Sequence, residues 1–298
     1  MLENFEKCRI AVNGIELNVA QAGVGPAVVL LHGYPQTHVM WHAIAPSLAR
    51  DYHVILPDLR GYGDSDKPQP APEDHVVYTK RTMAADIAAL MDTLGIASAH
   101  IVGHDRGARV GHRLALDHPE KVVSYTSLDV VATQAIFDGM DAALGRGLFH
   151  WLLMRQPHPI PETIIGNSVE TYFDYLMEFW CNTPGAIAPQ AMAEYRRCFC
   201  NQESVNATVA EYRAVELDLK HDEADRGPKI TCPMMVLWGG DASKRPGWPA
   251  GRGGDVLHTW HDRATDVRGR TLDCGHFLAE ERPDEVLTEL RAFLAEIS

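Results

Sequence analysis

The sequence lacks any run of about 18 consecutive apolar residues, which is the length that a membrane-spanning helix requires. Its first residues, MLENFEKCRIAVNG, include acidic side chains and no apolar stretch of the kind found in a secretory signal peptide. We therefore expect a cytoplasmic protein that has no membrane partner.

Clusters of basic residues are also missing, and the formal net charge of the 298-residue chain is −13. Because a protein that binds along a phosphate backbone needs a basic surface, nucleic acid is not an expected partner. The six cysteines show no metal-ligand spacing, since Cys198 and Cys200 are separated by one residue instead of two. We expect reduced thiols packed as small apolar groups, no metal site and no cofactor.

What the chain does have is enough length for a large α/β core with one inserted subdomain. Within the first 129 residues, short apolar runs alternate with segments of helical periodicity. The predicted strands are residues 27–31, 52–57, 99–102 and 122–128, and the predicted helices are residues 79–94 and 109–117. This alternation is typical of a mostly parallel, doubly wound sheet.

Residues 130–226 differ from the segments on either side of them. They contain helix-like stretches rich in Met, Phe, Trp and Tyr, separated by proline breaks, and no clear strand pattern. Strand character returns at residues 234–238, and a last helix is predicted over residues 283–297. We predict a core formed by residues 1–129 and 227–298, with a helical cap, residues 130–226, laid over it.

The segment AHIVGHDRG, residues 99–107, places Asp105 in a Gly-x-Asp-x-Gly turn between an apolar strand and a helix. This is the form of a nucleophile elbow, in which two glycines permit a sharp turn at the carboxyl end of the sheet. The backbone amide of Arg106 would then face an oxyanion formed at this position. The loop after residues 27–31, HGYP, is expected to supply the second oxyanion amide from Tyr34, whereas His32 in the same loop is expected to be structural.

An aspartate in place of serine or cysteine decides which chemistry the elbow favours. A carboxylate displaces a leaving group from an sp³ carbon and forms an alkyl-enzyme ester, which water must then cleave. Attack by a carboxylate on an ester or amide would give a labile anhydride. Asp105 therefore argues against protease, lipase and thioesterase activity.

His276, in the segment DCGHF, is the expected base, because the histidine comes last in the order of catalytic residues that this arrangement uses. It would activate the hydrolytic water while a carboxylate holds its ring in the required tautomer. Two acids compete for that second role. Asp129 follows the strand VVSYTSL and Asp241 follows MMVLWGG, and the local pattern does not choose between them.

The segments HGYPQTHVMWH, DLRGYGDSDKP, GHDRGARVGHR, LDV, FHW and GHF extend over nearly the whole chain. Through them the sequence resembles α/β-hydrolases of the fluoroacetate dehalogenase (haloacetate dehalogenase) family. The combination of GHDRGARVGHR with a later His-Trp pair is the most specific part of this resemblance. It implies hydrolysis of a small haloacid, haloacetate, to glycolate and halide through an aspartyl ester, and it implies a homodimer.

The resemblance also implies a role for individual residues. It places the nucleophile at Asp105, the base at His276 and the acid at Asp129 in preference to Asp241. The two arginines that bind the substrate carboxylate fall on Arg106 and Arg109. Independently of the resemblance, Arg109 is four residues beyond Asp105 on the predicted helix and so shares its face, and two guanidiniums suit the recognition of a carboxylate.

The resemblance assigns the halide pocket to His150, Trp151 and Tyr212, of which Tyr212 lies in the less specific segment VAEYRAV. These three side chains carry N–H or O–H donors, which can stabilise a departing halide ion as its charge develops. Taken without the resemblance, the His-Trp pair in GLFHWLLM would be interpreted as core packing.

An epoxide hydrolase is the main alternative, because such an enzyme uses the same aspartate, histidine and acid. It also needs cap tyrosines that protonate the opening ring, and the predicted cap contains Tyr172, Tyr175, Tyr195 and Tyr212. Neither an epoxide nor a haloalkane has a carboxylate for the two arginines to bind. A non-catalytic receptor on this scaffold would retain serine machinery, which Asp105 argues against.

Overall fold

The computed structural model describes residues 1–225, 227, 229–240 and 256–297. A single sheet contains the eight strands β1 (Glu6–Val12), β2 (Ile15–Ala22), β3 (Ala27–Leu31), β4 (His53–Pro57), β5 (Ala99–His104), β6 (Val122–Leu128), β7 (Met234–Gly239) and β8 (Val267–Leu272). Their order is β1-β2-β4-β3-β5-β6-β7-β8. β1 and β4 run antiparallel to β2, and the pairings from β4 to β8 are parallel. The predicted α/β-hydrolase fold with a mostly parallel sheet is confirmed.

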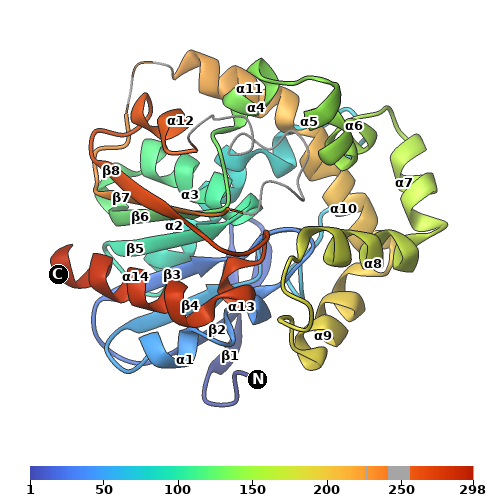
Figure 1. Ribbon diagram of the computed structural model, residues 1–298. Coiled ribbons are helices and arrows are strands. Elements are labelled where there is room, and N and C mark those ends of the chain that lie inside the picture. The colour runs from blue at the N-terminus through green and yellow to red at the C-terminus, as the bar shows by residue number, and fades with distance from the viewer. Residues whose placement is uncertain (226, 228, 241–255, 298) are drawn as a thin grey trace.

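Helices cover both faces of the sheet, which explains why β3 is a continuous apolar run and why every residue of β5 is buried. On one face, α2 (Lys80–Thr93) packs beside α3 (Arg106–Asp117). On the other lie α1 (Ala45–Leu48) and the last helix, α14 (Pro283–Ile297) (Figure 1). The short helices α12 (His258–His261) and α13 (Leu278–Glu281) flank β8 in the sequence.

The segment between β6 and β7 is helical and contains no strand among its described residues. Its helices are α4 (Thr133–Asp138), α5 (Ala142–Gly147), α6 (Phe149–Met154), α7 (Ile160–Gly166), α8 (Val169–Trp180), α9 (Pro189–Phe199), α10 (Gln202–Arg213) and α11 (Val215–Ala224). Figure 1 shows α5 to α10 gathered beyond the end of the sheet toward which the central strands point. The arrangement agrees with a cap, and the exact boundaries at residues 130 and 226 remain a prediction.

Two strands were not expected from the sequence. β1 and β2 form a hairpin whose turn consists of Asn13 and Gly14, both with positive φ (44° and 78°). An Asn-Gly pair between alternating runs is a known hairpin signal, so this pair could have been predicted. β8, with the sequence VRGRTL, is a partly exposed edge strand that carries two arginines and no apolar run.

Within the described residues, no helix combines the length and the apolar character that crossing a membrane requires.

Glu280 in α13 connects the core with the cap from a fully buried position. One of its carboxylate oxygens accepts a hydrogen bond from the hydroxyl of Tyr195 in α9 at 2.9 Å. The other accepts a hydrogen bond from the side-chain amide of Gln36 at 2.5 Å. Burial nevertheless raises the pKa of Glu280 to about 8.

This raised pKa makes the stability of the protein depend on pH. Between the ordinary value of 4.5 and about 8, the folded protein holds a proton on Glu280 that the unfolded chain releases. The free energy of unfolding should therefore fall as the pH rises through this window. Glutamine resembles the protonated acid, so Glu280→Gln should remove the part of the fall in unfolding free energy that comes from Glu280. Thermal unfolding of both proteins at about pH 5 and about pH 9 tests this, and the same pH dependence in both would contradict it.

Candidate active site

Asp105 occupies a strained turn between the end of β5 and the first residue of α3. Its φ of 46° and ψ of −114° lie outside the regions that a non-glycine residue ordinarily adopts. The flanking glycines allow the close packing: a Cβ on Gly103 would come within 2.5 Å of the backbone of Ala108, and one on Gly107 within 2.4 Å of the carbonyl oxygen of Leu31. The sequence thus produces a nucleophile elbow with Asp105 at its apex.

The loop after β3 reaches the carboxylate directly. The backbone amide of Tyr34 donates a hydrogen bond to Oδ2 of Asp105 at 3.0 Å. This contact agrees with the predicted oxyanion amide of Tyr34. The second amide, that of Arg106, belongs to the first residue of α3 and remains a prediction.

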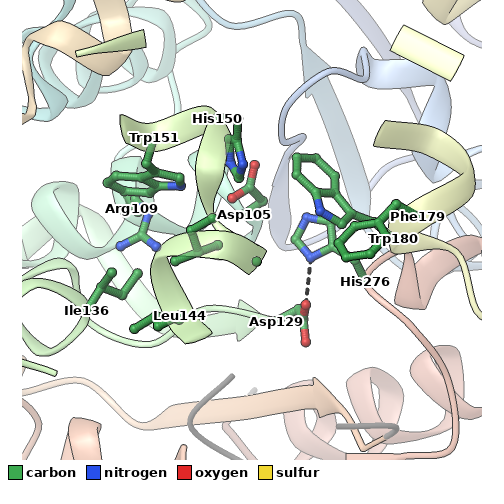
Figure 2. A pocket seen from close by; sticks show the side chains of 12 residues that line it. Asp105, Arg109, Asp129, Ile136, Leu144, His150, Trp151, Phe179, Trp180 and His276 are labelled. Atoms are coloured by element: carbon green, nitrogen blue, oxygen red, sulfur yellow. Dashed lines mark hydrogen bonds and ion pairs between the residues drawn. The ribbon is translucent and has the colours of Figure 1, made fainter. Parts of the chain in front are cut away.

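His276 and Asp129 lie in hydrogen-bonding contact, with 2.6 Å between Nδ1 of the histidine and Oδ2 of the carboxylate (Figure 2). Asp129 directly follows β6, has a positive φ of 56°, and accepts a hydrogen bond on Oδ1 from the amide of Gly239 at 2.9 Å. Both side chains line the same pocket as Asp105. The geometry therefore favours Asp129 as the acid. The competing candidate, Asp241, lies outside the described residues.

Contacts to its backbone fix His276 in place. Its amide donates to the carbonyl oxygen of Trp180 at 2.8 Å, and its own carbonyl oxygen lies 2.7 Å from Nε2 of His104. His104 is fully buried, and burial lowers its pKa to about 3, so this ring is neutral and Nε2 carries the proton that it donates. Neither contact was anticipated. No role was predicted for His104, which lies within the elbow motif. Nothing in the sequence around Trp180 indicated this contact, apart from the many aromatic residues of that segment.

The electrostatic surroundings keep the nucleophile ionised. Burial alone would raise the pKa of Asp105, but its electrostatic interactions with His276, Arg106 and Arg109 outweigh burial and hold the pKa below its usual value. A deprotonated carboxylate is the form that can act as a nucleophile.

A small cavity of about 60 Å³ opens in front of Asp105. Its lining combines the candidate catalytic residues with apolar side chains, mostly from the cap: Asp105, Arg109, Asp129, Ile136, Leu144, Gly147, Leu148, His150, Trp151, Phe179, Trp180 and His276. Figure 2 shows Arg109 below the ring of Trp151, on the opposite side of Asp105 from Trp180 and His276. The pocket thus has a cationic side and a side that carries the candidate base.

The two predicted carboxylate-binding arginines are placed differently. Arg109 lines the cavity, and its Nη1 donates to the carbonyl oxygen of Val131 at 3.2 Å and to Oγ1 of Thr133 at 2.8 Å. Its Nε is buried and has no hydrogen-bond partner. Burial lowers the pKa of Arg109 to about 10, which leaves it charged at neutral pH. Arg106 is not among the lining residues; its Nε donates to Glu211 at 2.8 Å, and its Nη1 is buried without a partner.

The predicted halide-binding residues form an aromatic cluster. The ring centroid of Tyr212 lies 5.6 Å from that of His150 and 5.3 Å from that of Trp151. His150 and Trp151 line the cavity, whereas Tyr212 packs behind them. Burial lowers the pKa of His150 to about 3, so the ring is neutral, and its Nδ1 has no hydrogen-bond partner. The structure brings the three together, and their contact with halide remains a prediction.

The relatives of this chain include a dehalogenase and epoxide hydrolases. The sequence pattern of the alpha/beta hydrolase fold matches residues 26–153. A fluoroacetate dehalogenase from Burkholderia sp is 37% identical over 99% of this chain and 96% of its own. A soluble epoxide hydrolase from Corynebacterium sp. (strain C12) is 29% identical over 95% of each chain. The solved structure of a Nostoc sp PCC 7120 protein, described as an α/β hydrolase, is 46% identical, covers 99% of both chains and has a TM-score of 0.94.

Proposed function

This chain belongs to the α/β-hydrolase family, in the group that includes fluoroacetate dehalogenase, and from that premise we propose that it hydrolyses haloacetate to glycolate and halide. That it is a hydrolase follows from the family. We propose in addition that it cleaves a carbon-halide bond and that its substrate is haloacetate.

In the first step, an Asp105 carboxylate oxygen attacks the carbon that bears the halogen, and the carbon-halogen bond breaks as the new C–O bond forms. The amide of Tyr34, 3.0 Å from Oδ2, holds the carboxylate in position. The halide leaves toward the donors of His150 and Trp151, whose interaction strengthens as negative charge develops.

In the second step, water attacks the carbonyl carbon of the ester. His276 takes the proton of that water, and Asp129, 2.6 Å from Nδ1, stabilises the imidazolium that forms. Collapse of the tetrahedral intermediate breaks the ester C–O bond, and the leaving oxygen takes up a proton to give glycolate. The Asp105 carboxylate is restored, and the remaining proton of the attacking water is lost to solvent, which returns His276 to its neutral form.

The observation that carries the proposal is the pair of buried guanidiniums beside an aspartate nucleophile. Arg106 and Arg109 each have a buried N–H group without a hydrogen-bond partner, and both guanidinium carbons lie about 5 Å from the ring centroid of Trp151 (5.1 and 5.0 Å). A buried donor without an acceptor is costly, and a substrate carboxylate would supply the acceptors. The cavity of about 60 Å³ suits an acid as small as haloacetate.

Epoxide hydrolysis is the second candidate, because an epoxide hydrolase is among the relatives. Of the cap tyrosines considered for protonating an epoxide, Tyr175 is exposed and Tyr195 is bound to Glu280. The ring of Tyr212 lies against Arg106, with 4.2 Å between the ring centroid and the guanidinium carbon. A neutral epoxide would leave the unpartnered N–H groups of both arginines unsatisfied, which favours the haloacid.

Halide release from fluoroacetate and chloroacetate, measured beside diol formation from a small epoxide, tests the proposed function. We expect halide from at least chloroacetate and little diol. Rapid epoxide opening without halide release would establish the second candidate instead.

Truncation of Arg109 tests the recognition of the carboxylate. Arg109→Leu should lower kcat/KM for chloroacetate by roughly 10- to 150-fold, the loss expected for one charge-assisted hydrogen bond to a buried anion. Chloroacetamide, which is nearly the same size and uncharged, should be affected far less. Arg106→Leu should act in the same direction. Equal losses on both substrates in both variants would show that the arginines do not recognise the charge.

A further inference from the structure

Glu211, in α10 of the cap, is a fully buried carboxylate that contacts three groups of the core. Its Oε1 accepts hydrogen bonds from Nε of Arg106 at 2.8 Å and from Nζ of Lys80 at 2.5 Å. Its Oε2 accepts one from the hydroxyl of Tyr62. Lys80 begins α2 and is itself buried, so neither cation in this cluster has access to bulk water.

The charges of this cluster do not cancel. Burial raises the pKa of Glu211, but Arg106 and Lys80 outweigh it and keep the pKa below its usual value, so the carboxylate is ionised. Arg106 and Lys80 thus share one carboxylate oxygen of Glu211, and within these three residues the positive charges outnumber the negative one. Asp218, which accepts a hydrogen bond from the backbone amide of Lys80 at 2.8 Å, has its pKa raised by burial.

The same contacts fix the guanidinium of Arg106. Glu211 holds Nε, and the ring of the neighbouring Tyr212 lies against the guanidinium carbon at 4.2 Å. With these contacts made, Nη1 remains as a buried donor without a partner. An arginine paired with Glu211 alone would be neutralised, and a substrate anion would have to compete with that carboxylate.

We propose that Lys80 and Glu211 are positioning residues for carboxylate recognition: Glu211 fixes the Arg106 guanidinium, and Lys80 offsets the negative charge of Glu211, so that Arg106 retains its attraction for an anionic substrate. This inference rests on the proposed function. It adds two residues, neither in the cavity lining, that set the preference for charged over neutral substrates.

The experiment compares kcat and KM for chloroacetate and chloroacetamide in the purified full-length protein. Lys80→Met removes the offsetting charge and should raise KM for chloroacetate roughly 10-fold, as expected for a unit charge acting across a buried site. KM for chloroacetamide should change little. Lys80→Gln, which retains a donor toward Glu211, replaces the methionine variant if that variant does not fold.

The double variant Lys80→Met with Glu211→Gln distinguishes charge balance from simple structural damage. It restores the net charge of the cluster to that of the native protein and leaves an oxygen acceptor for Arg106. KM for chloroacetate should therefore return toward the native value. If the two residues had only a structural role, KM in the double variant would be at least as high as in Lys80→Met.

Asp86→Asn is the matched control, because Asp86 forms a buried ion pair with Arg60 at 2.7 Å outside the site. This variant should lower the unfolding temperature and leave the preference for chloroacetate over chloroacetamide unchanged. An equal rise of KM for both substrates in the Lys80 variants would overturn the role of Lys80 and Glu211, and so would a double variant whose KM for chloroacetate does not recover. In either case, turnover of chloroacetate by the native protein would still support the proposed function. If the native protein releases no halide from chloroacetate, the proposed function fails and this role with it.

Discussion

Replacing His276 with asparagine is expected to stop turnover and to leave a covalent ester on Asp105. The first step needs only the ionised carboxylate, which the surrounding positive charges maintain. The second step needs a base for the attacking water, and His276, hydrogen-bonded to Asp129, is placed to provide it. Removal of the base should lower kcat by at least about 10³-fold, since ester formation would continue and ester cleavage would not.

Intact-protein mass spectrometry after incubation with chloroacetate measures this outcome. The His276→Asn protein should gain the mass of one carboxymethyl group, and peptide mapping should place it on Asp105. The control is the double variant that also carries Asp105→Asn, which should not be modified. An unmodified single variant that still binds the substrate would contradict the two-step mechanism.

Asp129→Asn is the second variant for which a very large loss is expected. The carboxylate oxygen that lies 2.6 Å from Nδ1 of His276 accepts a hydrogen bond from the Nδ1–H group and so leaves Nε2 free to act as a base. An asparagine amide in its place can present an N–H group and reverse the tautomer, which lowers kcat by about 10⁴-fold in catalytic triads. Asp129 also accepts a hydrogen bond from Gly239, so the unfolding temperature must be measured beside the activity.

The comparison with Asp241→Asn makes this prediction specific to one acid. We expect the Asp241 variant to keep most of its activity. A crippled Asp241 variant beside a nearly normal Asp129 variant would reverse the assignment.

The sequence was sufficient to predict features that depend on local pattern. The elbow around Asp105 needs a strand, two glycines and a helix in succession, and the pattern of residues 99–117 shows all of them. The alternation of apolar and helical segments likewise predicted the central strands. The hairpin of β1 and β2 carried a usable signal in Asn13 and Gly14, whereas the edge strand β8 is too exposed to need an apolar run.

Features that depend on contacts between distant segments could not be predicted in the same way. Asp129 and Asp241 both follow strands, and the local pattern does not choose between them. The resemblance prefers Asp129, and the contact of Asp129 with His276 agrees with that preference. Glu211 is separated from Arg106 by 105 residues and from Lys80 by 131, and in the sequence it is one acid among 40 acidic residues. Its role becomes visible only when the cap helix lies against the core.

Single-turnover hydrolysis in water enriched in heavy oxygen tests whether Asp105 is the nucleophile. With enzyme in excess over chloroacetate, we expect glycolate whose hydroxyl oxygen is unlabelled, because that oxygen comes from Asp105. The label should appear in the Asp105 carboxylate, where water attacks the ester. Glycolate labelled at its hydroxyl group in this first turnover would mean that water attacks the substrate directly, and it would contradict Asp105 as the nucleophile.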